Sequence, residues 1–251
     1  MDGAAGVLAQ ATVGIASTVR AAADGSRWPD GVNEWDGGSV TGSDAPVVLV
    51  PGSFVPGEFY WHRLVPGLIA DGRRVFACNL PGLGTREPAV LVDALEEFLT
   101  RVRAATGTGR VVLVGQSFGG VVIRDLVRST RADVVGVVLV SAQNHGFRRW
   151  WAGLFSAPLA RRLVQVVCPM ALRLLPGSGY LAELDATDPG VAVTTITSRR
   201  DVFAAPESVR VSGGNNIVLQ DLDPRIRSGH MLIGFDPMTV DLIRAAVRNA
   251  G

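Results

Sequence analysis

The chain has 251 residues, 47% of them hydrophobic, which is enough for one large domain with a full core. Its formal net charge is +1 and no long run of like charge occurs, so the sequence predicts no nucleic-acid partner. No apolar run approaches the roughly 18 residues of a membrane span, and no transmembrane segment is predicted. Cys78 and Cys168 lie outside any metal-ligand spacing and are predicted to be buried thiols.

Residues 1–44 are predicted to form an N-terminal tail and a lead-in to the folded domain. The tail begins with an alanine-rich stretch whose apolar part ends at Arg20. Its first residues include Asp2, whereas an export signal begins with positive charge. This favours a cytoplasmic location, with secretion through an atypical signal as the alternative.

From residue 45 to the C-terminus, short β-branched runs alternate with longer stretches of helical periodicity. Strands are predicted at 47–50, 74–80, 110–114, 134–142, 191–197 and 215–219. Helices are predicted over 88–106, after Ser117 and over 237–249. Continuous apolar strands that alternate with helices form a mostly parallel sheet covered on both faces. The predicted fold class is therefore α/β, a doubly wound domain over residues 45–251.

Residues 146–190 interrupt this alternation. They contain no predicted strand, and they combine many apolar side chains with arginines and prolines. We expect a helical cap insertion that covers the site and receives an acyl chain; the alternative is that it only shields the sheet. The side chains predicted to bind substrate are Trp150, Trp151 and Phe155.

A serine lies between two glycines at the end of the strand predicted at 110–114. The segment Gly115-Gln116-Ser117-Phe118-Gly119 has the form G-x-S-x-G, which is common by itself but here links a strand to a helix. In that context the pattern is typical of a nucleophile elbow, in which a strained turn exposes the serine hydroxyl above the sheet. Ser117 is the predicted nucleophile.

A serine hydroxyl needs a base to remove its proton, and the base is usually a histidine. The chain has three histidines. His230 follows the last predicted strand, in a loop at the edge where parallel strands end, and is the predicted base. His145, just after the strand at 134–142, is the alternative, whereas His62 is predicted to lie on the surface or to serve packing.

The carboxylate that orients this histidine has several candidates: Asp185, Asp188, Asp201, Asp221, Asp223 and Asp236. Chain order in this fold is serine, acid, histidine, which excludes Asp236 if His230 is the base. Asp201 stands a few residues beyond the strand at 191–197, where a loop could bring it beneath a histidine. It is the predicted acid, with Asp223 as the main alternative.

The remaining part of such a site is an oxyanion hole made of backbone N–H groups. One donor is expected from the residue after the nucleophile, Phe118, and one from the loop after the first core strand. That loop reads VVLVPGSFVPG, where Gly52 allows close backbone approach and Ser53 presents the second N–H.

With these residues placed, the sequence resembles bacterial lipases and esterases of the α/β-hydrolase superfamily, close to small actinobacterial triacylglycerol lipases. The motifs that carry the resemblance are VVLVPG, VVLVGQSFGG, SAQNHG, TSRRD and VLQDLDPRIRSGHMLIGFDP. The resemblance implies Ser117, Asp201 and His230 as a catalytic triad, and Ser53 and Phe118 as the oxyanion hole. Some lipases carry Thr after Pro-Gly, and that likeness implies that the Ser53 hydroxyl is a further oxyanion donor.

The predicted function is hydrolysis of carboxylic esters through an acyl-enzyme on Ser117, with no metal and no organic cofactor. The predicted partner is a small-molecule acyl ester or thioester. Two alternatives stay open: a thioesterase or acyltransferase of a biosynthetic pathway, and a non-catalytic binding protein of the same fold. The oligomeric state is left open.

Overall fold

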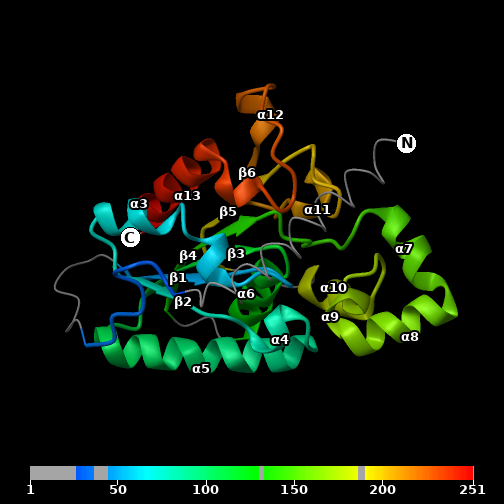
Figure 1. Cartoon of the computed structure of the whole chain (residues 1–251), viewed down its shortest axis with the longest axis horizontal. Coiled ribbons are helices and arrows are strands. Elements are labelled where there is room, and N and C mark those ends of the chain that lie inside the picture. The colour runs from blue at the N-terminus through cyan, green and yellow to red at the C-terminus, as the bar shows by residue number, and fades with distance from the viewer. Residues whose placement is uncertain (1–26, 37–44, 130–132, 186–189, 251) are drawn as a thin grey trace.

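The computed structural model describes residues 27–36, 45–129, 133–185 and 190–250, without the side chains of residues 152 and 154–156. Its centre is a six-stranded sheet in the order β2-β1-β3-β4-β5-β6, with every neighbouring pair parallel (Figure 1). This confirms the predicted α/β fold class. The strands are β1 (Val47–Val50), β2 (Val75–Ala77), β3 (Val111–Gln116), β4 (Val134–Val140), β5 (Val193–Thr197) and β6 (Asn215–Val218).

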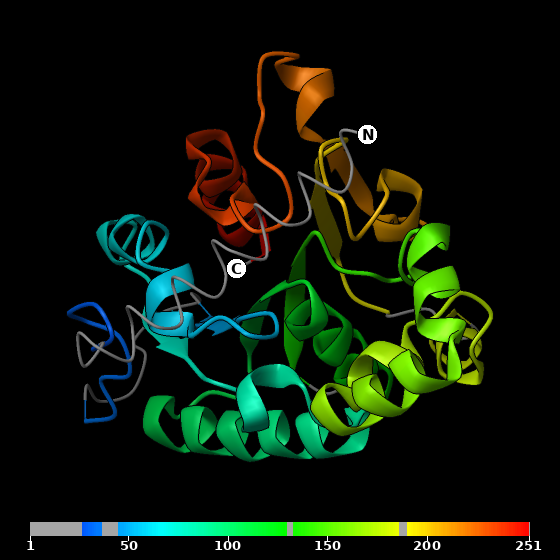
Figure 2. The same ribbon diagram turned by 45° about the vertical axis from the view of Figure 1, so that its right-hand side comes forward.

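Helices cover both faces of the sheet, with α5 and α6 on one side and α3 and α13 on the other (Figure 2). Short helices and one 3₁₀ turn occupy the connections. Outside the β4–β5 connection, the helical elements are α2 (Gly57–Tyr60), α3 (Val65–Ala70), α4 (Pro81–Gly84), α5 (Pro88–Thr106), α6 (Phe118–Ser129), α11 (Pro206–Val209), α12 (Leu219–Leu222), η1 (Ile233–Phe235) and α13 (Pro237–Ala250).

Strand β1 shows why the sequence forms a sheet buried on both faces. All four of its residues are buried; Val48 and Val50 belong to the core on the α5–α6 side, and Val47 and Leu49 to the core on the α3–α13 side. Because successive strand side chains point to opposite faces, only a continuously apolar strand fits between two helical layers. This is the pattern that predicted the doubly wound fold.

Helix α5 has the bounds predicted from its periodicity. It begins at Pro88, whose fixed φ suits a first helical turn, and ends before Gly107, whose φ of 68° closes the helix in the left-handed region. Leu91, Leu95 and Leu99 recur every four residues and are fully buried against the sheet. Each such leucine contributes about 1.5–3 kcal/mol through burial.

Several strand ends differ from their predicted positions, among them the end of β2 at Ala77 and not at residue 80, and for two of them the backbone shows the reason. β3 continues to Gln116 because that residue still pairs with Val140 of β4. β4 ends at Val140, two residues earlier than predicted, because Ser141 adopts a φ of 50° that a strand cannot continue. The carboxyl ends of β1, β3, β4 and β5 therefore deliver their loops to one edge of the sheet.

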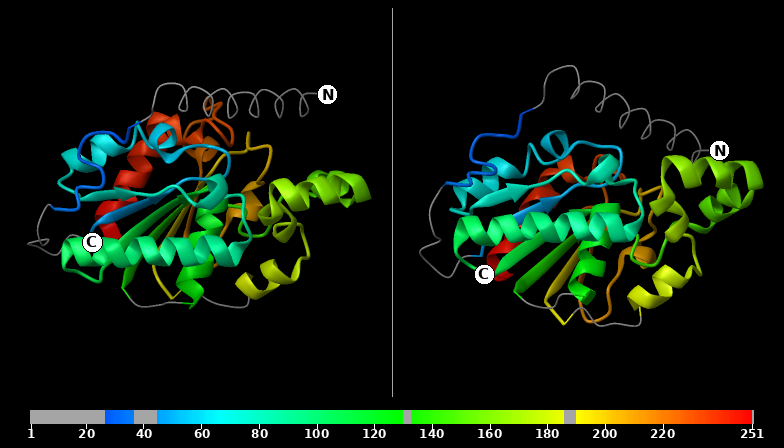
Figure 3. Two further views of the ribbon diagram at one scale, coloured as in Figure 1. Left: turned by 60° about the horizontal axis from the view of Figure 1, so that its bottom comes forward. Right: turned by 90° about the horizontal axis from the view of Figure 1, so that it is seen from below.

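The connection between β4 and β5 is helical, with α7 (Arg149–Ser156), α8 (Pro158–Val167), α9 (Pro169–Arg173) and α10 (Gly179–Asp185). This α7–α10 segment extends beyond one end of the sheet (Figure 3). α9 and α10 anchor it, because Met170, Leu181 and Leu184 are buried in the core on the α5–α6 side. α8, by contrast, contains no buried residue. The cap function predicted for residues 146–190 stays a prediction.

Candidate active site

Ser117 occupies the turn between β3 and α6 in a strained conformation. Its φ is 52°, a left-handed value that costs a non-glycine residue on the order of 1–3 kcal/mol. The turn is tight enough that a Cβ on Gly115 would lie 2.7 Å from the Cα of Gly120, so a side chain there would force strand and helix apart. The Ser117 N–H donates to the carbonyl of Val140 at 2.9 Å and fixes the turn to β4.

A continuous chain of hydrogen bonds joins Ser117, His230 and Asp201. His230 Nε2 lies 2.8 Å from Ser117 Oγ, and His230 Nδ1 lies 2.7 Å from Asp201 Oδ2. The three residues are 6%, 4% and 1% exposed, respectively. They come from three different loops at the carboxyl edge of the sheet, so only the fold brings them into contact.

The carboxylate of Asp201 is held by more than the histidine. Its Oδ1 accepts the backbone N–H groups of Phe203 and Ala204, each at 2.8 Å, while Oδ2 faces His230 Nδ1. Because both oxygens of this carboxylate act as hydrogen-bond acceptors, Nδ1 of the imidazole carries the proton in the bond to Oδ2. Nε2 of His230 is then the acceptor for the Ser117 hydroxyl.

The other two histidines are engaged elsewhere. His145, the alternative base, places Nδ1 3.0 Å from Asp185 Oδ2 and Nε2 2.9 Å from the carbonyl of Arg210. With both ring nitrogens occupied, His145 has no bond to Ser117. His62 is exposed, and its Nδ1 lies 2.8 Å from the Phe59 carbonyl.

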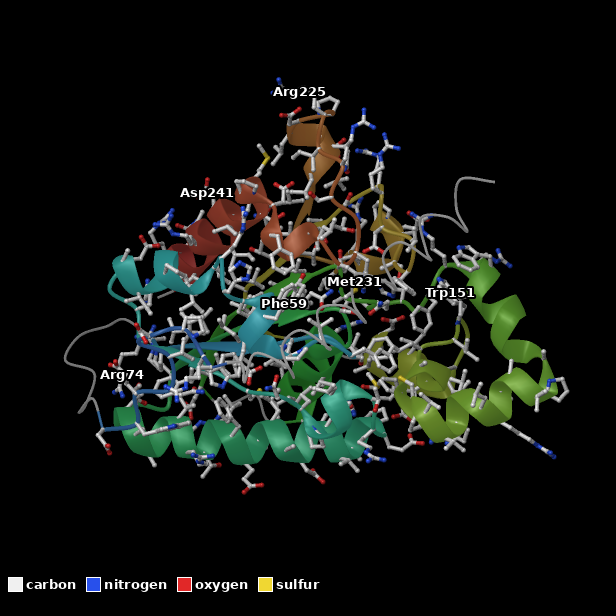
Figure 4. All side chains as sticks on the ribbon, viewed as in Figure 1. Phe59, Arg74, Trp151, Arg225, Met231 and Asp241 are labelled. Atoms are coloured by element: carbon white, nitrogen blue, oxygen red, sulfur yellow. The ribbon has the colours of Figure 1, made fainter. Side chains whose placement is uncertain are left out.

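Asp223, the alternative acid, pairs with a neighbouring arginine. Its two carboxylate oxygens accept bonds from Arg225 at 3.0 and 2.8 Å, and these bonds lower the pKa of Asp223 to about 2. Arg225 lies at the outer tip of the segment that carries α12, away from Met231 at the cavity (Figure 4). The structure therefore brings Asp201, and not Asp223, to His230.

Two backbone N–H groups are available beside Ser117 for an oxyanion. Within the described residues, no hydrogen bond engages the N–H of Phe118 or that of Ser53. Gly52 lies so close to the elbow that a Cβ there would be 2.8 Å from Ser117 Cβ. The Ser53 hydroxyl, expected as a further donor, instead donates its one hydrogen to the Gly84 carbonyl, at 2.5 Å. In this structure the hydroxyl hydrogen therefore points to the α4 loop and not toward Ser117.

A cavity of about 350 Å³ opens onto Ser117 and His230. Its wall is mostly apolar and combines the loop after β1, the elbow, the loops after β4 and β5, and helices α7 to α9. The lining residues are Ser53, Phe54, Ser117, Phe118, Gln143, Phe147, Trp151, Leu163, Val164, Val167, Cys168, Ala171, Phe203, His230 and Met231.

Of the three side chains predicted to bind substrate, one lines this cavity. Trp151 does so from α7, stacked on Phe203 with ring centroids 5.0 Å apart (Figure 4). Trp150 is 48% exposed and stacks on the outer side of Trp151, so it is not part of the cavity wall. The side chain of Phe155 lies outside the described residues.

Sequence reasoning missed most of the cavity wall. Leu163, Val164 and Val167 share one face of α8, a spacing visible in the sequence, whereas nothing local marks Gln143 or Phe203. Cys168 also lines the cavity; it is free and buried, and burial raises the pKa of its thiol to about 11.

In the described part of the chain, no helix is long and apolar enough to cross a membrane, and no cluster of ligating side chains is suited to a metal ion.

Comparisons with known proteins agree with this fold. Two triacylglycerol lipases, from Pseudarthrobacter phenanthrenivorans and Burkholderia plantarii, are each 29% identical over 107 residues, or 40% of this chain. That match spans 34% and 30% of their lengths, so the chain covers about a third of each curated relative. Aspergillus fumigatus lipase B superposes with a TM-score of 0.71 at 18% identity, over 90% of this chain and 56% of the lipase. The carboxylesterase CesB of Bacillus subtilis gives 0.55 at 17% identity, over 84% and 86%.

Residues 47–250 match the model of the alpha/beta hydrolase family. That match spans nearly the whole described chain, from the first residue of β1 to the last of α13. The chain therefore belongs to the alpha/beta hydrolase family, which confirms the resemblance seen in the sequence motifs.

Proposed function

We propose that this protein hydrolyses carboxylic esters through an acyl-enzyme on Ser117. The observation that carries the proposal is the buried hydrogen-bond chain from Ser117 through His230 to Asp201, with distances of 2.8 and 2.7 Å. Ser117 lies at a strained turn and lines an apolar cavity, and such backbone strain is typical of functional sites. The match to lipases and carboxylesterases supports the same reaction class.

In the first half of the reaction, Ser117 Oγ attacks the ester carbonyl carbon while His230 Nε2 takes the hydroxyl proton. Asp201 holds the imidazole in the required tautomer and stabilises its charged form. The tetrahedral intermediate collapses, the alcohol leaves with the proton from His230, and the acyl group stays on Ser117. In the second half, water attacks the acyl-enzyme with the same proton transfers and releases the carboxylic acid.

The negative oxygen of each tetrahedral intermediate is stabilised by the N–H groups of Phe118 and Ser53. Phe118 is the first residue of α6, so the positive end of the helix dipole adds to its N–H. One such preorganised donor is worth about 10²–10³ in kcat. The Ser53 hydroxyl has a separate role: by holding the Gly84 carbonyl, it fixes the loop that presents the Ser53 N–H.

The acyl group of the substrate occupies the apolar cavity under α7 and α8. These helices cap it, with Trp151 on one wall and Leu163, Val164 and Val167 on another. Burial of each CH₂ group contributes about 0.8 kcal/mol, so affinity rises with chain length until the cavity is full. A cavity of about 350 Å³ suits a medium-length acyl chain rather than acetate alone.

The decisive test is covalent labelling of Ser117. A fluorophosphonate is expected to react once per chain with the wild-type protein and not at all with Ser117→Ala, which also loses turnover of p-nitrophenyl esters. Ser129→Ala, at the far end of α6, is the matched control and keeps both. Ordinary turnover by correctly folded Ser117→Ala, measured beside its circular dichroism spectrum, would falsify the mechanism.

A further inference from the structure

Gln143 is a buried amide that faces the nucleophile and has no role in the reaction described above. It follows β4 by three residues, is 1% exposed and lines the cavity. Its Nε2 lies 3.2 Å and its Oε1 3.4 Å from Ser117 Oγ. Of the other polar side chains on the cavity wall, Ser117 and His230 belong to the triad and the Ser53 hydroxyl is bonded to Gly84.

The hydrogen-bonding capacity of this amide is only partly used. Ser117 has one hydroxyl hydrogen, which goes to His230 Nε2 when the serine is ready to react, so Ser117 Oγ can accept from Gln143 Nε2 but cannot donate to Oε1. Within the described residues, Oε1 and the second N–H of Gln143 then have no partner. Acylation removes the remaining bond as well, because an ester oxygen is a weak acceptor.

The backbone directly after Gln143 is held by buried hydrogen bonds. Asn144 is fully buried, and its Nδ2 donates to the carbonyl of Val209 at 2.6 Å. Arg124 donates to the carbonyl of Asn144 at 2.9 Å, and the N–H of His145 donates to the carbonyl of Ser208 at 2.9 Å. The backbone that carries the Gln143 amide is therefore fixed before any substrate binds.

Strand order shows which part of a substrate this amide faces. β1 and β4 flank β3 on opposite sides, so the β1 loop with Ser53 and the β4 loop with Gln143 approach Ser117 from opposite directions. The oxyanion lies on the Ser53 side. The Gln143 side continues into the apolar wall formed by Phe147 and Trp151, where the acyl chain runs. The amide therefore meets the first carbons of the acyl group.

We propose that Gln143 forms a polar subsite that selects acyl groups with a hydroxyl on the second or third carbon. A hydroxyl accepts the free N–H of Gln143 or donates to its Oε1, so it fills one of the two open positions. A plain fatty acyl group leaves a buried amide unpaired, which is costly in an apolar cavity. The proposal rests on the proposed esterase function and names the substrate class of that site.

The test compares three p-nitrophenyl esters of equal chain length: butanoate, 2-hydroxybutanoate and 3-hydroxybutanoate. Each kcat/KM is divided by the rate of hydroxide-catalysed hydrolysis of the same ester, which removes differences in intrinsic reactivity. The variants are Gln143→Met, which keeps the shape and removes the amide, and Gln165→Met, the matched control on the exposed face of α8. Gln143→Leu repeats the measurement if Gln143→Met does not fold.

With the wild-type protein and Gln165→Met, we expect at least one hydroxy ester to exceed butanoate by about tenfold. In Gln143→Met this preference falls to near unity, because kcat/KM drops by more on the hydroxy esters than on butanoate. A preference that survives in Gln143→Met, or is absent from the wild type, overturns the subsite. An equal loss on all three esters also overturns it, since Gln143 would then only position Ser117.

Fluorophosphonate labelling separates this failure from failure of the proposed function. If the wild type labels at Ser117 and hydrolyses butanoate without regard to the hydroxyl, only the subsite is wrong. If it neither labels nor hydrolyses any of the esters, the esterase function is wrong and the subsite falls with it.

Discussion

At the residue scale, the site depends on a carboxylate whose every oxygen has a fixed partner. Asp201 accepts two backbone N–H groups on Oδ1 and faces His230 through Oδ2. Arg148 donates to the Asp201 carbonyl at 2.8 Å, so the backbone of the residue is held as well. This preorganisation means that the imidazole needs no rearrangement when it becomes charged.

Asp201→Asn is expected to lower kcat by several orders of magnitude, by analogy with the roughly 10⁴-fold loss when a triad aspartate becomes asparagine. The amide cannot stabilise the charged imidazole and favours the wrong tautomer. Asp223→Asn is the matched control, because that carboxylate pairs with Arg225 outside the site, and its kcat stays near wild type. Steady-state kinetics on one ester measures kcat for both variants. A large loss of kcat in Asp223→Asn with near-normal kcat in Asp201→Asn would show that the acid is not Asp201.

Ser53→Ala separates the backbone of Ser53 from its hydroxyl. Because the hydroxyl hydrogen is bonded to Gly84, the variant keeps the oxyanion-hole N–H and loses only a loop contact. We expect kcat to fall by less than about tenfold, below the 10²–10³ typical of a lost oxyanion donor. A hundredfold loss of kcat at unchanged KM would mean that the hydroxyl turns toward the oxyanion during the reaction.

At the element scale, the α7–α10 segment joins the cavity to the acid loop. Trp151 is sandwiched between Trp150, at 4.2 Å, and Phe203, at 5.0 Å, while Phe203 packs on the ring of His230 at 4.9 Å. The Trp151 indole N–H also donates to the Val202 carbonyl at 3.1 Å. The cavity wall formed by Trp151 is thus bound to the loop that carries Asp201.

Trp151→Ala is expected to flatten the rise of kcat/KM with acyl length from acetate to octanoate, since it removes an apolar wall of the cavity. Trp150→Ala is the control on the next residue, and because Trp150 is half-exposed it leaves the slope nearly intact. Kinetics on a series of p-nitrophenyl esters provides the measurement. Equal slopes in the wild type and Trp151→Ala would show that the acyl chain does not contact α7.

At the scale of the whole molecule, Asp71 connects α3 near the start of the fold to the C-terminal helix α13. Its carboxylate accepts bonds from Arg244 at 2.7 and 2.9 Å and from Arg248 at 3.0 Å. These bonds, chiefly that from Arg244, lower the pKa of Asp71 below 3.8. Folding therefore favours the ionised form of Asp71. The contact stabilises the folded protein at pH values above the pKa of the unfolded state, and this stabilisation is lost as pH falls through the lower pKa of the folded state.

Asp71→Asn is expected to lower Tm by about 2–4 °C at pH 7 relative to the wild type. The Tm difference between the two proteins shrinks as pH is lowered below about 4. In that range the Asp71 carboxylate of the wild type also becomes neutral. Asp241→Asn is the control, because that exposed residue lies 3.7 Å from Arg244 and gains little from the pair. Thermal unfolding at several pH values measures this; a difference that does not depend on pH would rule out the ionic contact.

The sequence by itself determined what depends on local pattern. The continuously apolar sequence of β1 required a helical layer on each face, Pro88 and Gly107 bounded α5, and the pattern around Ser117 indicated the turn between β3 and α6. Chain order and loop position also favoured His230 and Asp201 over His145 and Asp223. Local pattern indicates fold and loop position because neighbouring residues fix backbone conformation and because parallel strands send their loops to one edge.

Only the tertiary structure decided the contacts between distant segments. The bond from Ser53 to Gly84 spans 31 residues, and the approach of Gln143 to Ser117 spans 26. The exposure of Trp150 beside partly buried Trp151 likewise depends on which face of α7 meets Phe203. A hydroxyl or an amide carries no mark in the sequence of the partner it will find, because that partner is chosen by packing.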